Sequence, residues 1–442
     1  MLTCLAVLVL ALEPAPQAGE GAVAFPELAL ALQLPALEHL ERKESKNPTE
    51  KGSWTGMLGA SAVRLNLDVL PVGEYGLFEP EDVVEAWRDS IREKSEYTFQ
   101  PIRCIAGAVG CSPILATTRA SFQSEGKKGS LFLVGGLLPE YGWSLRVDAW
   151  PELEAAAADK LALALETCAK YSGKARDPRW TDEEALALWK KHAPESTFKK
   201  YEKPVRTEHF IVMTNSTSPG PFVKKLEGWY ASIKKAMPSE ELKGRRLLPI
   251  LLFRTDDDFQ AFYRARYKLT VKDEVREESV CGDSWVATSC DNADDHEHLL
   301  DVSRLFIEVR LRAWGSNRWL ESGLRECVAS APKERVEALR AIKKGKCTEL
   351  EKLLDDSAWK AEDEKRDKKG TSDEADYWEQ SALWMDFLRD GPWPKDSFQR
   401  FLRSVSGLAE HDQAGVVAAL QSVYGMDPKA LQPKWVEYYS KK

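Results

Sequence analysis

Histidine and carboxylate side chains gather in one short stretch of this chain. His296 and His298 flank Glu297, and Asp295 and Asp301 lie nearby. Imidazole and carboxylate groups are ligands for zinc and nickel, and a loop conformation would let both histidines chelate one ion. On a helix, residues two positions apart point to different sides. The acidic residues would then simply favour a helix N-terminus, where the helix dipole attracts negative charge.

Two glutamates further along could also do chemistry. Glu308 and Glu321 could act as a general acid and base, as paired carboxylates do in glycosidases. Under the metal hypothesis, Glu321 would join His296 and His298 as a ligand of a hydrolytic zinc. The alternative is ion pairing at the surface with the arginines that crowd the same segment. These arginines are Arg304, Arg310, Arg312, Arg318 and Arg325.

The spacing of apolar residues predicts that two helices position these groups. Helical spacing on one buried face is seen at Leu299, Val302, Leu305, Phe306, Val309 and Trp314. Gly315 and Asn317 interrupt this pattern, which indicates a turn. A second helix starts near Trp319 and carries Leu320 and Leu324.

The second helix resembles a motif of the thermolysin-like zinc peptidases, the gluzincin or peptidase MA-like family. Residues 319–326, WLESGLRE, are similar to W-L-x-E-G-x-A-E, in which the glutamate before the glycine is the third zinc ligand. In that family, His-Glu-x-x-His on the preceding helix supplies two histidine ligands and a glutamate as general base. The resemblance therefore implies where a metal site would lie in this chain.

The residues at the family's functional positions do not suit that chemistry. In an ungapped register, the His-Glu-x-x-His positions fall on Asp301, Val302 and Leu305, and the glutamate ligand falls on Ser322. A gapped register that keeps Glu308 as the base puts the two histidines on Ile307 and Leu311. Neither register retains a zinc-binding triad. We therefore expect no cofactor and no peptidase activity, and zinc enters only under the alternative of a divergent hydrolase using His296, His298 and Glu321.

The resemblance extends over residues 207–442 through the order of the elements. A strand at 208–215 and a helix at 221–237 come first. A buried strand at 247–253 and a helix capped by Thr255 come next, before the two helices described above. Helices follow to the end, at 377–388, 398–405 and 416–424, and a last turn begins at 427. The sequence thus predicts a degenerate peptidase MA-like domain at 207–442.

The preceding residues predict a separate domain at 26–173. Alternating apolar and polar residues at 63–69 indicate a half-buried strand, and Pro80 opens an amphipathic helix to Ile91. Strand candidates follow at 113–123, 130–136 and 142–149, and an Ala/Leu-rich helix is predicted from Glu152 to Tyr171. Residues 174–206 are predicted to form a linker with one short helix. The expected fold class is α+β, an antiparallel-sheet sandwich followed by the gluzincin-like domain.

Charge and the N-terminal residues bear on location and partners. The 442 residues carry a net charge of −8, which argues against nucleic-acid binding. Downstream of the N-terminus, no apolar run approaches the roughly 20 residues needed to span a bilayer. Residues 2–12 are apolar and precede a polar, Pro-containing segment, so residues 1–18 are predicted to be a signal for export to the periplasm, cell envelope or exterior. The alternative is a buried N-terminal helix, because no lysine or arginine precedes the run.

The cysteines allow disulfides if the protein is exported. Close spacing suggests the pairs Cys104–Cys111, Cys281–Cys290 and Cys327–Cys347. Unpaired structural thiols are the alternative, since connectivity cannot be deduced from sequence. The sequence has no Gly-x-Ser-x-Gly elbow and no phosphate-binding GxxxxGK[ST] loop. The functional hypothesis is an exported, non-catalytic protein with a binding or scaffold role toward an unknown protein or peptide, bound either by the degenerate domain or by the N-terminal one.

Overall fold

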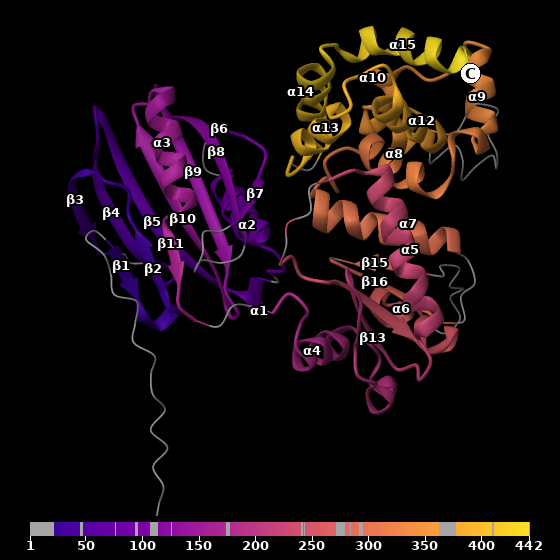
Figure 1. Ribbon diagram of the computed structural model, residues 1–442, viewed down its shortest axis with the longest axis horizontal. Coiled ribbons are helices and arrows are strands. Elements are labelled where there is room, and N and C mark those ends of the chain that lie inside the picture. Colours follow the sequence, from indigo (N-terminus) through magenta and orange to yellow (C-terminus); the bar gives the residue numbers. More distant parts are fainter. Residues whose placement is uncertain are drawn as a thin grey trace, which may run out of the picture. The chain divides into compact units, whose positions relative to one another are not determined.

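The structure is a computed structural model in which the chain forms two compact units. The first extends to Arg176 and the second starts at Asp177. Two short segments are exceptions, because residues 101–103 belong to the second unit and residues 242–244 to the first. The described residues are 22–44, 47–75, 77–92, 96–106, 114–124, 126–173, 177–239, 242, 244–270, 279–282, 284–290, 295–361, 377–408 and 411–441. The predicted export signal, residues 1–18, lies outside them. The α+β class is confirmed, with antiparallel sheets in the first unit and a mostly helical C-terminal half (Figure 1).

The first unit is built around a large antiparallel sheet. As far as the chain is described, its order is β3-β4-β5-β10-β9-β8-β6, with β7 also paired to β8. The strands are β3 (Glu38–Lys43), β4 (Glu50–Leu58), β5 (Ser61–Pro71), β6 (Glu96–Phe99), β7 (Arg103–Ala106), β8 (Ile114–Ser124), β9 (Lys127–Leu137) and β10 (Tyr141–Trp150). The strands predicted at 63–69, 113–123, 130–136 and 142–149 are thus confirmed as β5, β8, β9 and β10.

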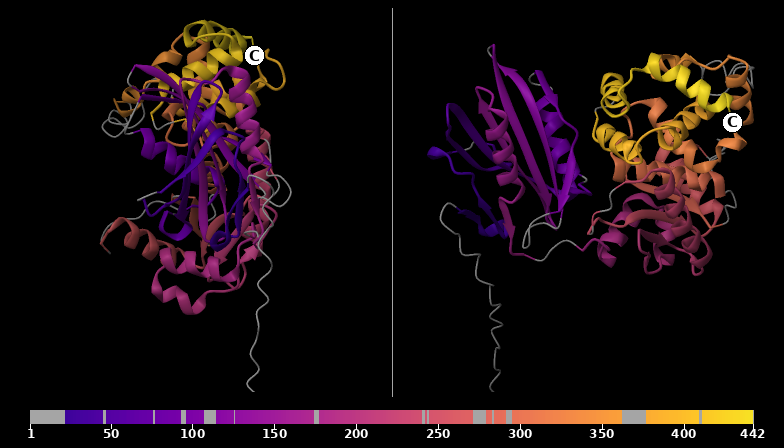
Figure 2. Two further views of the ribbon diagram at one scale, coloured as in Figure 1. Left: turned by 90° about the vertical axis from the view of Figure 1, so that its left-hand side faces the viewer. Right: turned by 45° about the horizontal axis from the view of Figure 1, so that its top comes forward.

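One face of this sheet forms the main core of the unit. The alternation in β5 points Leu65 and Leu67 into this face, and β10 adds Leu145 and Val147 opposite them. A small sheet in the order β1-β2-β11 contributes to the same core, together with α3 (Ala155–Glu166). Its strands are β1 (Ala22–Phe25), β2 (Leu30–Gln33) and β11 (Ala169–Tyr171). Figure 2 gives two further views of this twisted arrangement.

Helix α2 (Pro80–Arg92), which was predicted from its amphipathic pattern, packs against β8, β9 and β10. It comes close because glycines leave room on the strands. A Cβ added to Gly142 would lie 2.5 Å from Val83, and one added to Gly135 would lie 3.2 Å from Val84. A side chain at Gly142 would thus force Val83 to move, and one at Gly135 would be a tight fit against Val84.

The free edge of the large sheet is β3, which pairs with β4. All six residues of β3 are exposed, and the register shifts between Glu38 and Glu41. The edge strand is therefore irregular and largely charged.

The second unit begins with residues that were expected to be a linker. Helix α4 (Asp182–His192) has a capping box in which Thr181 and Glu184 each accept a backbone N–H from the other. Its Trp189 is fully buried, with ring centroids 5.1 Å from Phe253 and 5.5 Å from Tyr201. The short helix is confirmed, but residues 177–206 pack into the second unit instead of linking two domains.

A mixed sheet forms the first half of this unit. The described strands have the order β12-β13-β14-β16-β15, with β13, β14 and β16 parallel and the two edge strands antiparallel. The strands are β12 (Val205–Arg206), β13 (Phe210–Thr214), β14 (Leu248–Phe253), β15 (Ser279–Gly282) and β16 (Trp285–Ser289). Helices α5 (Gly220–Ala236) and α6 (Asp256–Tyr267) connect the parallel strands, and Thr255 caps α6 as predicted.

The second half of the unit is helical and lies at the opposite end from the sheet (Figure 1). The helices are α7 (Asp295–Phe306), α8 (Arg318–Ala329), α9 (Val336–Lys343), α10 (Leu350–Leu353), α12 (Tyr377–Asp390), α13 (Ser397–Val405), α14 (Gln413–Tyr424) and α15 (Pro428–Ser440). Helices α8 and α12 pack at Gly323, where an added Cβ would lie 2.8 Å from the Ser381 carbonyl oxygen. The last predicted turn is a full helix, α15.

The Ala/Leu-rich helix predicted to reach Tyr171 is shorter than expected. It ends at Glu166, and Ala169–Tyr171 forms strand β11 against β2. The Cys168 carbonyl already accepts the Gln33 N–H at 2.6 Å. Pairing with β2 therefore replaces the last helical turn.

Candidate functional site

The predicted helix pair exists, and a distorted turn joins its two members. After α7, residues Ile307–Leu311 form a π-helical segment, and Arg312 and Gly315 adopt positive φ angles of 53° and 83°. Asn317 is extended, and α8 starts at Arg318. Segments of π-helix are frequent at functional sites. Helix α7, which precedes this segment, packs against β15 and α8.

Asp301, the first of the degenerate family positions, lies inside a hydrogen-bonded contact. The Ser279 hydroxyl of β15 donates to Asp301 Oδ2 at 2.5 Å, and Arg325 of α8 approaches Oδ1 at 3.6 Å. The residue is only 8% exposed. Asp301 thus connects β15, α7 and α8, which is a structural task for a carboxylate.

The remaining family positions supply no metal ligand in either register. Val302 and Leu305 are buried in the core, at 1% and 0% exposure, and Ser322 is half-buried. In the gapped register, Ile307 and Leu311 are likewise buried. Aliphatic side chains cannot bind zinc, and at these positions they pack the helix pair.

Glu308 faces the other end of β15. Its Oε1 accepts the Ser284 backbone N–H at 2.8 Å, and its Oε2 lies 4.0 Å from Cys281 Sγ. Burial, followed by the negative charge of Glu308, raises the pKa of the Cys281 thiol well above its usual range. The thiol is therefore held protonated, and it is a poor nucleophile.

Glu321 turns inward to the distorted turn rather than forming the predicted surface ion pairs. It accepts backbone N–H groups of Gly315 and Asn317. Burial nevertheless dominates and raises the pKa of Glu321 to about 7, with Asp356 adding repulsion and Arg304 offsetting part of it. This residue is a carboxyl group whose proton is exchanged near neutral pH, the property of a general acid or base.

Arg304 lies on α7 three residues after Asp301 and four residues before Glu308, which belongs to the π-helical segment. Its guanidinium carbon lies 4.3 Å from the ring centroid of Trp314. Its Nε is buried without a hydrogen-bond partner, a statement that covers the described residues. In the sequence, Arg304 is one of several arginines that could form ion pairs in this segment. Its position three residues after Asp301 and four residues before Glu308 is the sequence feature that could have pointed to a place near these carboxylates.

The alternative metal ligands are not brought together. His298 is 2% exposed, with Nε2 at 2.6 Å from Thr288 Oγ1 and its ring 5.4 and 5.5 Å from those of Phe222 and Trp229. His296, two positions earlier on α7, is exposed. Within the described ranges, no group of three or more His, Cys, Asp or Glu side chains could hold a metal ion. Because both histidines lie on helix α7, two positions apart, they point to different sides of it.

Two predicted disulfides are not formed. Cys281, Cys327 and Cys347 are free thiols. Cys281 pairs with Val286 across β15 and β16, and four further residues at roughly 3.3 Å each put Cys290 beyond the reach of a disulfide. Cys327 donates to the Leu324 carbonyl at 3.2 Å, and Cys347 accepts from Gln432 at 3.7 Å. The third pair, Cys104–Cys111, includes a residue outside the described ranges.

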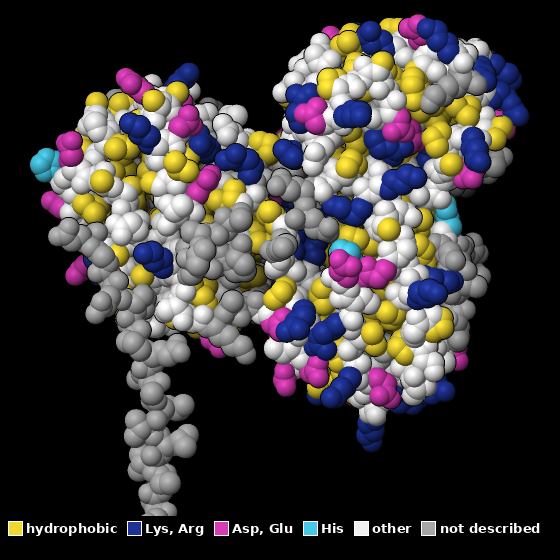
Figure 3. Space-filling view, viewed as in Figure 1, with side chains coloured by type: hydrophobic (Ala, Val, Ile, Leu, Met, Phe, Trp, Pro, Cys, Tyr) yellow, Lys and Arg dark blue, Asp and Glu magenta, His cyan; other side chains and the backbone are white. Residues whose placement is uncertain are grey.

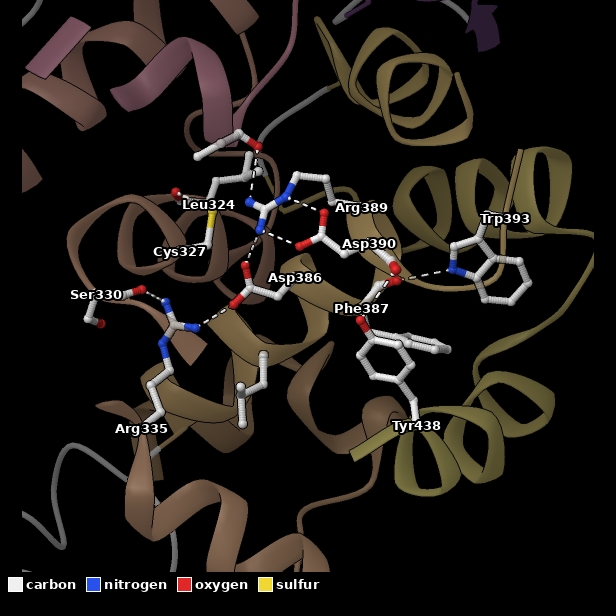
Figure 4. Close-up of polar contacts among 12 residues, drawn as sticks. Leu324, Cys327, Ser330, Arg335, Asp386, Phe387, Arg389, Asp390, Trp393 and Tyr438 are labelled. Carbon is white, nitrogen blue, oxygen red and sulfur yellow. Dashed lines mark hydrogen bonds and ion pairs between the residues drawn. The ribbon is translucent and has the colours of Figure 1, made fainter. Parts of the chain in front are cut away.

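A second ionic cluster lies between α8, α12 and the segment before α9 (Figure 4). Asp386 accepts from Arg335 at 2.5 Å and from Arg389 at 2.6 Å. Arg335 also donates to the Glu326 and Ser330 carbonyls at the end of α8. Asp386 and Arg335 are each 2% exposed. This cluster is internal and fastens helix ends, so it is a structural network.

The first unit carries a polar sheet face with one perturbed carboxyl group. Asp68 is 2% exposed, and burial raises its pKa to about 6 although Arg146 offsets part of this. Arg146 itself donates to Asp148 at 3.0 Å. Ser53 donates to Asn66 at 2.9 Å on the neighbouring strands. Hydrogen bonds thus link Arg146 to Asp148 and Ser53 to Asn66 on this face.

Comparisons with known proteins give no family for this chain. No protein-family model matches it, and no curated protein matches it. In the part of the chain that the structure describes, no helix is both long and apolar enough to cross a membrane. On the face drawn in Figure 3, lysine and arginine side chains are interspersed with acidic ones.

Proposed function

We propose that this chain is an exported, non-catalytic protein whose residues 207–442 form a metallopeptidase-like domain without zinc ligands. Its role is to bind a protein or peptide partner at the site between β15, α7 and α8. The apolar run at residues 2–12 supports export. The proposal rests on the residues at the four family positions.

Those four positions carry the argument. Catalytic zinc needs three protein ligands and an open position for water. Asp301 is engaged by Ser279 and Arg325, while Val302 and Leu305 are buried in the core. Loss of this set of ligands removes the metal-bound water that such peptidases use.

The order of elements supports the family resemblance. The chain runs through strand β13, helix α5, strand β14 and the Thr255-capped helix α6, and α7 follows after β15 and β16. This is the order that the resemblance implies. The first residues of α8, Trp319 and Leu320, are fully buried, and Gly323 lets α12 approach. Trp319, Leu320 and Gly323 of the motif thus pack the helices together, and this packing does not need a metal.

Zinc binding by a variant with restored ligands tests both the family resemblance and the loss of the zinc ligands. The purified chain, without a metal-binding tag, is dialysed after zinc addition, and zinc per chain is measured by mass spectrometry. We expect near-zero zinc for the natural chain. The combined variant Asp301→His, Val302→Glu, Leu305→His and Ser322→Glu should bind about one zinc, because it restores all four family positions.

The gapped register supplies the matched control. The variant Ile307→His with Leu311→His, which keeps Glu308, should bind no zinc if the ungapped register is right. About one tightly held zinc in the natural chain, with peptidase activity lost on chelation, would refute the proposal. Zinc in the control variant alone would show that the register is shifted. Circular dichroism checks that each variant is folded.

A further inference from the structure

Arg304 stands out at this site because its charge has no direct partner. Among the described residues, no hydrogen bond or ion pair to its guanidinium is found, and Nε is buried without a partner. The side chain as a whole is half-buried. A buried, unsatisfied donor on a cation costs free energy, so an arrangement that keeps one calls for an explanation.

The nearby carboxylates are already engaged elsewhere. Asp301 accepts from Ser279, Glu308 accepts from the Ser284 backbone, and Glu321 accepts from backbone groups of the turn. Arg304 attracts Glu321 only at longer range, as its effect on that residue's pKa shows. The acids therefore set the local potential without neutralising Arg304 by contact.

Trp314 holds the guanidinium in place. With the guanidinium carbon 4.3 Å from the ring centroid, the contact is a close cation–π interaction. Stacking on an aromatic face leaves the N–H groups at the edge of the guanidinium plane available. The geometry presents a planar, oriented set of donors that needs little further ordering to bind a ligand.

We propose that Arg304, stacked on Trp314, binds a carboxylate group of the partner at the site between β15, α7 and α8. This inference rests on the proposed function and names the chemistry of its ligand. A planar guanidinium matches the two oxygens of a carboxylate in a bidentate pair. The carboxylate is the C-terminus of a peptide.

The surrounding charges favour a carboxylate over a phosphate. Asp301 and Glu308 come three residues before and four residues after Arg304, and Glu321 is close enough for Arg304 to affect its pKa. Arg325 of α8 is engaged with Asp301 and the Leu300 carbonyl. Doubling the charge of the ligand doubles both its attraction to Arg304 and its repulsion by these carboxyl groups. Because the three carboxyl groups outnumber Arg304 and Arg325, the repulsion grows more than the attraction. The site therefore suits a singly charged ligand.

Binding of a defined peptide tests the inference. The probes are fluorescein-labelled tetraalanine with a free C-terminal carboxylate, the same peptide ending in an amide, and acetate as competitor. Fluorescence anisotropy with the full chain should show about tenfold or tighter binding of the acid than of the amide. Arg304→Met should abolish this preference, and Arg304→Lys should retain part of it because lysine keeps the charge without the planar donors.

A matched control removes an equivalent arginine elsewhere in the unit. Arg266 of α6 stacks on Trp285 at 4.7 Å, so Arg266→Met loses the same charge and the same kind of contact. It should leave the acid-over-amide preference intact. In the natural chain, acetate and the acidic peptide should also slow phenylglyoxal modification of Arg304 and leave that of Arg266 unchanged, a readout that needs no variant to fold.

Each contrary result is distinct. Equal binding of acid and amide would overturn carboxylate recognition while leaving a peptide-binding function standing. Equal loss of the preference in both methionine variants would show a general charge effect and overturn the role of Arg304. Absence of binding by both peptides, with no protection of Arg304 by acetate, would also overturn it, and zinc measurements would then decide the proposed function separately.

Discussion

Replacing Glu321 with glutamine should remove a pH-dependent loss of stability from the second unit. Glu321 has a pKa of about 7 in the folded chain against an ordinary value of 4.5. Between these values the folded chain keeps a proton that the unfolded chain has lost. Stability therefore falls as the pH rises through this window, and it levels off above pH 7.

The magnitude follows from the size of the pKa change. Each pKa unit corresponds to about 1.4 kcal/mol, so ionising the folded side chain costs at most roughly 3 kcal/mol. Water reaches part of the side chain and reduces this cost. We expect Glu321→Gln to be about 1–3 kcal/mol more stable than the natural chain at pH 8 and about equal to it at pH 5, because the glutamine oxygen can accept the same backbone N–H groups.

Urea unfolding at pH 5 and pH 8, followed by tryptophan fluorescence, measures this difference. Of the 15 tryptophans, only four precede residue 177, so the signal reports mainly on the second unit. Glu437→Gln is the control, because the hydrogen bond from Lys441 lowers the pKa of that exposed carboxyl group. An advantage of Glu321→Gln that is the same at both pH values would show that Glu321 titrates normally, and the burial argument would fail.

Two further substitutions test the packing of the helical half. Gly323→Ala should destabilise the chain by about 1–3 kcal/mol, because the new Cβ would lie 2.8 Å from the Ser381 carbonyl oxygen. Gly228→Ala in α5, where nothing lies within 4 Å, should be neutral or stabilising in the same urea titration, and equal effects would refute the close-approach argument. Asp386→Asn should cost about 3–5 kcal/mol because it leaves buried arginines without their counter-charge. Asp390→Asn, at a carboxylate with half its side chain exposed, should cost less than about 1 kcal/mol, and a thermal melt that shifts equally for both would contradict a buried network.

Local patterns were enough to predict most elements. The alternation that defines β5, the capping residues Thr181 and Thr255, and the apolar spacing of α7 all depend on neighbours in sequence. Each is found at about the expected position. The short strands β1, β2 and β11 were not predicted, since a three- or four-residue strand has too little pattern to differ from a helix end or a loop.

The contacts that form the candidate site could not be predicted from the spacing of residues in the sequence. Ser279 and Asp301 are 22 residues apart, and their hydrogen bond depends on β15 lying along α7. His298 shows the reverse case. Its place beside Glu297 and His296 suggested a ligand cluster, whereas the turn of the helix sends it into an aromatic core. Residue types and their spacing thus indicated where a functional site could lie. Which side chains contact one another there could be known only from the fold.

The charged edge strand of the first unit affects how copies of this chain meet at high concentration. A flat strand with free N–H and C=O groups invites another strand to extend the sheet. Strand β3 instead exposes Glu38, Glu41, Arg42 and Lys43, and its register is shifted between Glu38 and Glu41. An incoming strand would meet a kinked backbone and would have to desolvate four charges. Growth of the sheet from one molecule into the next is therefore disfavoured at this edge, which helps the protein resist aggregation.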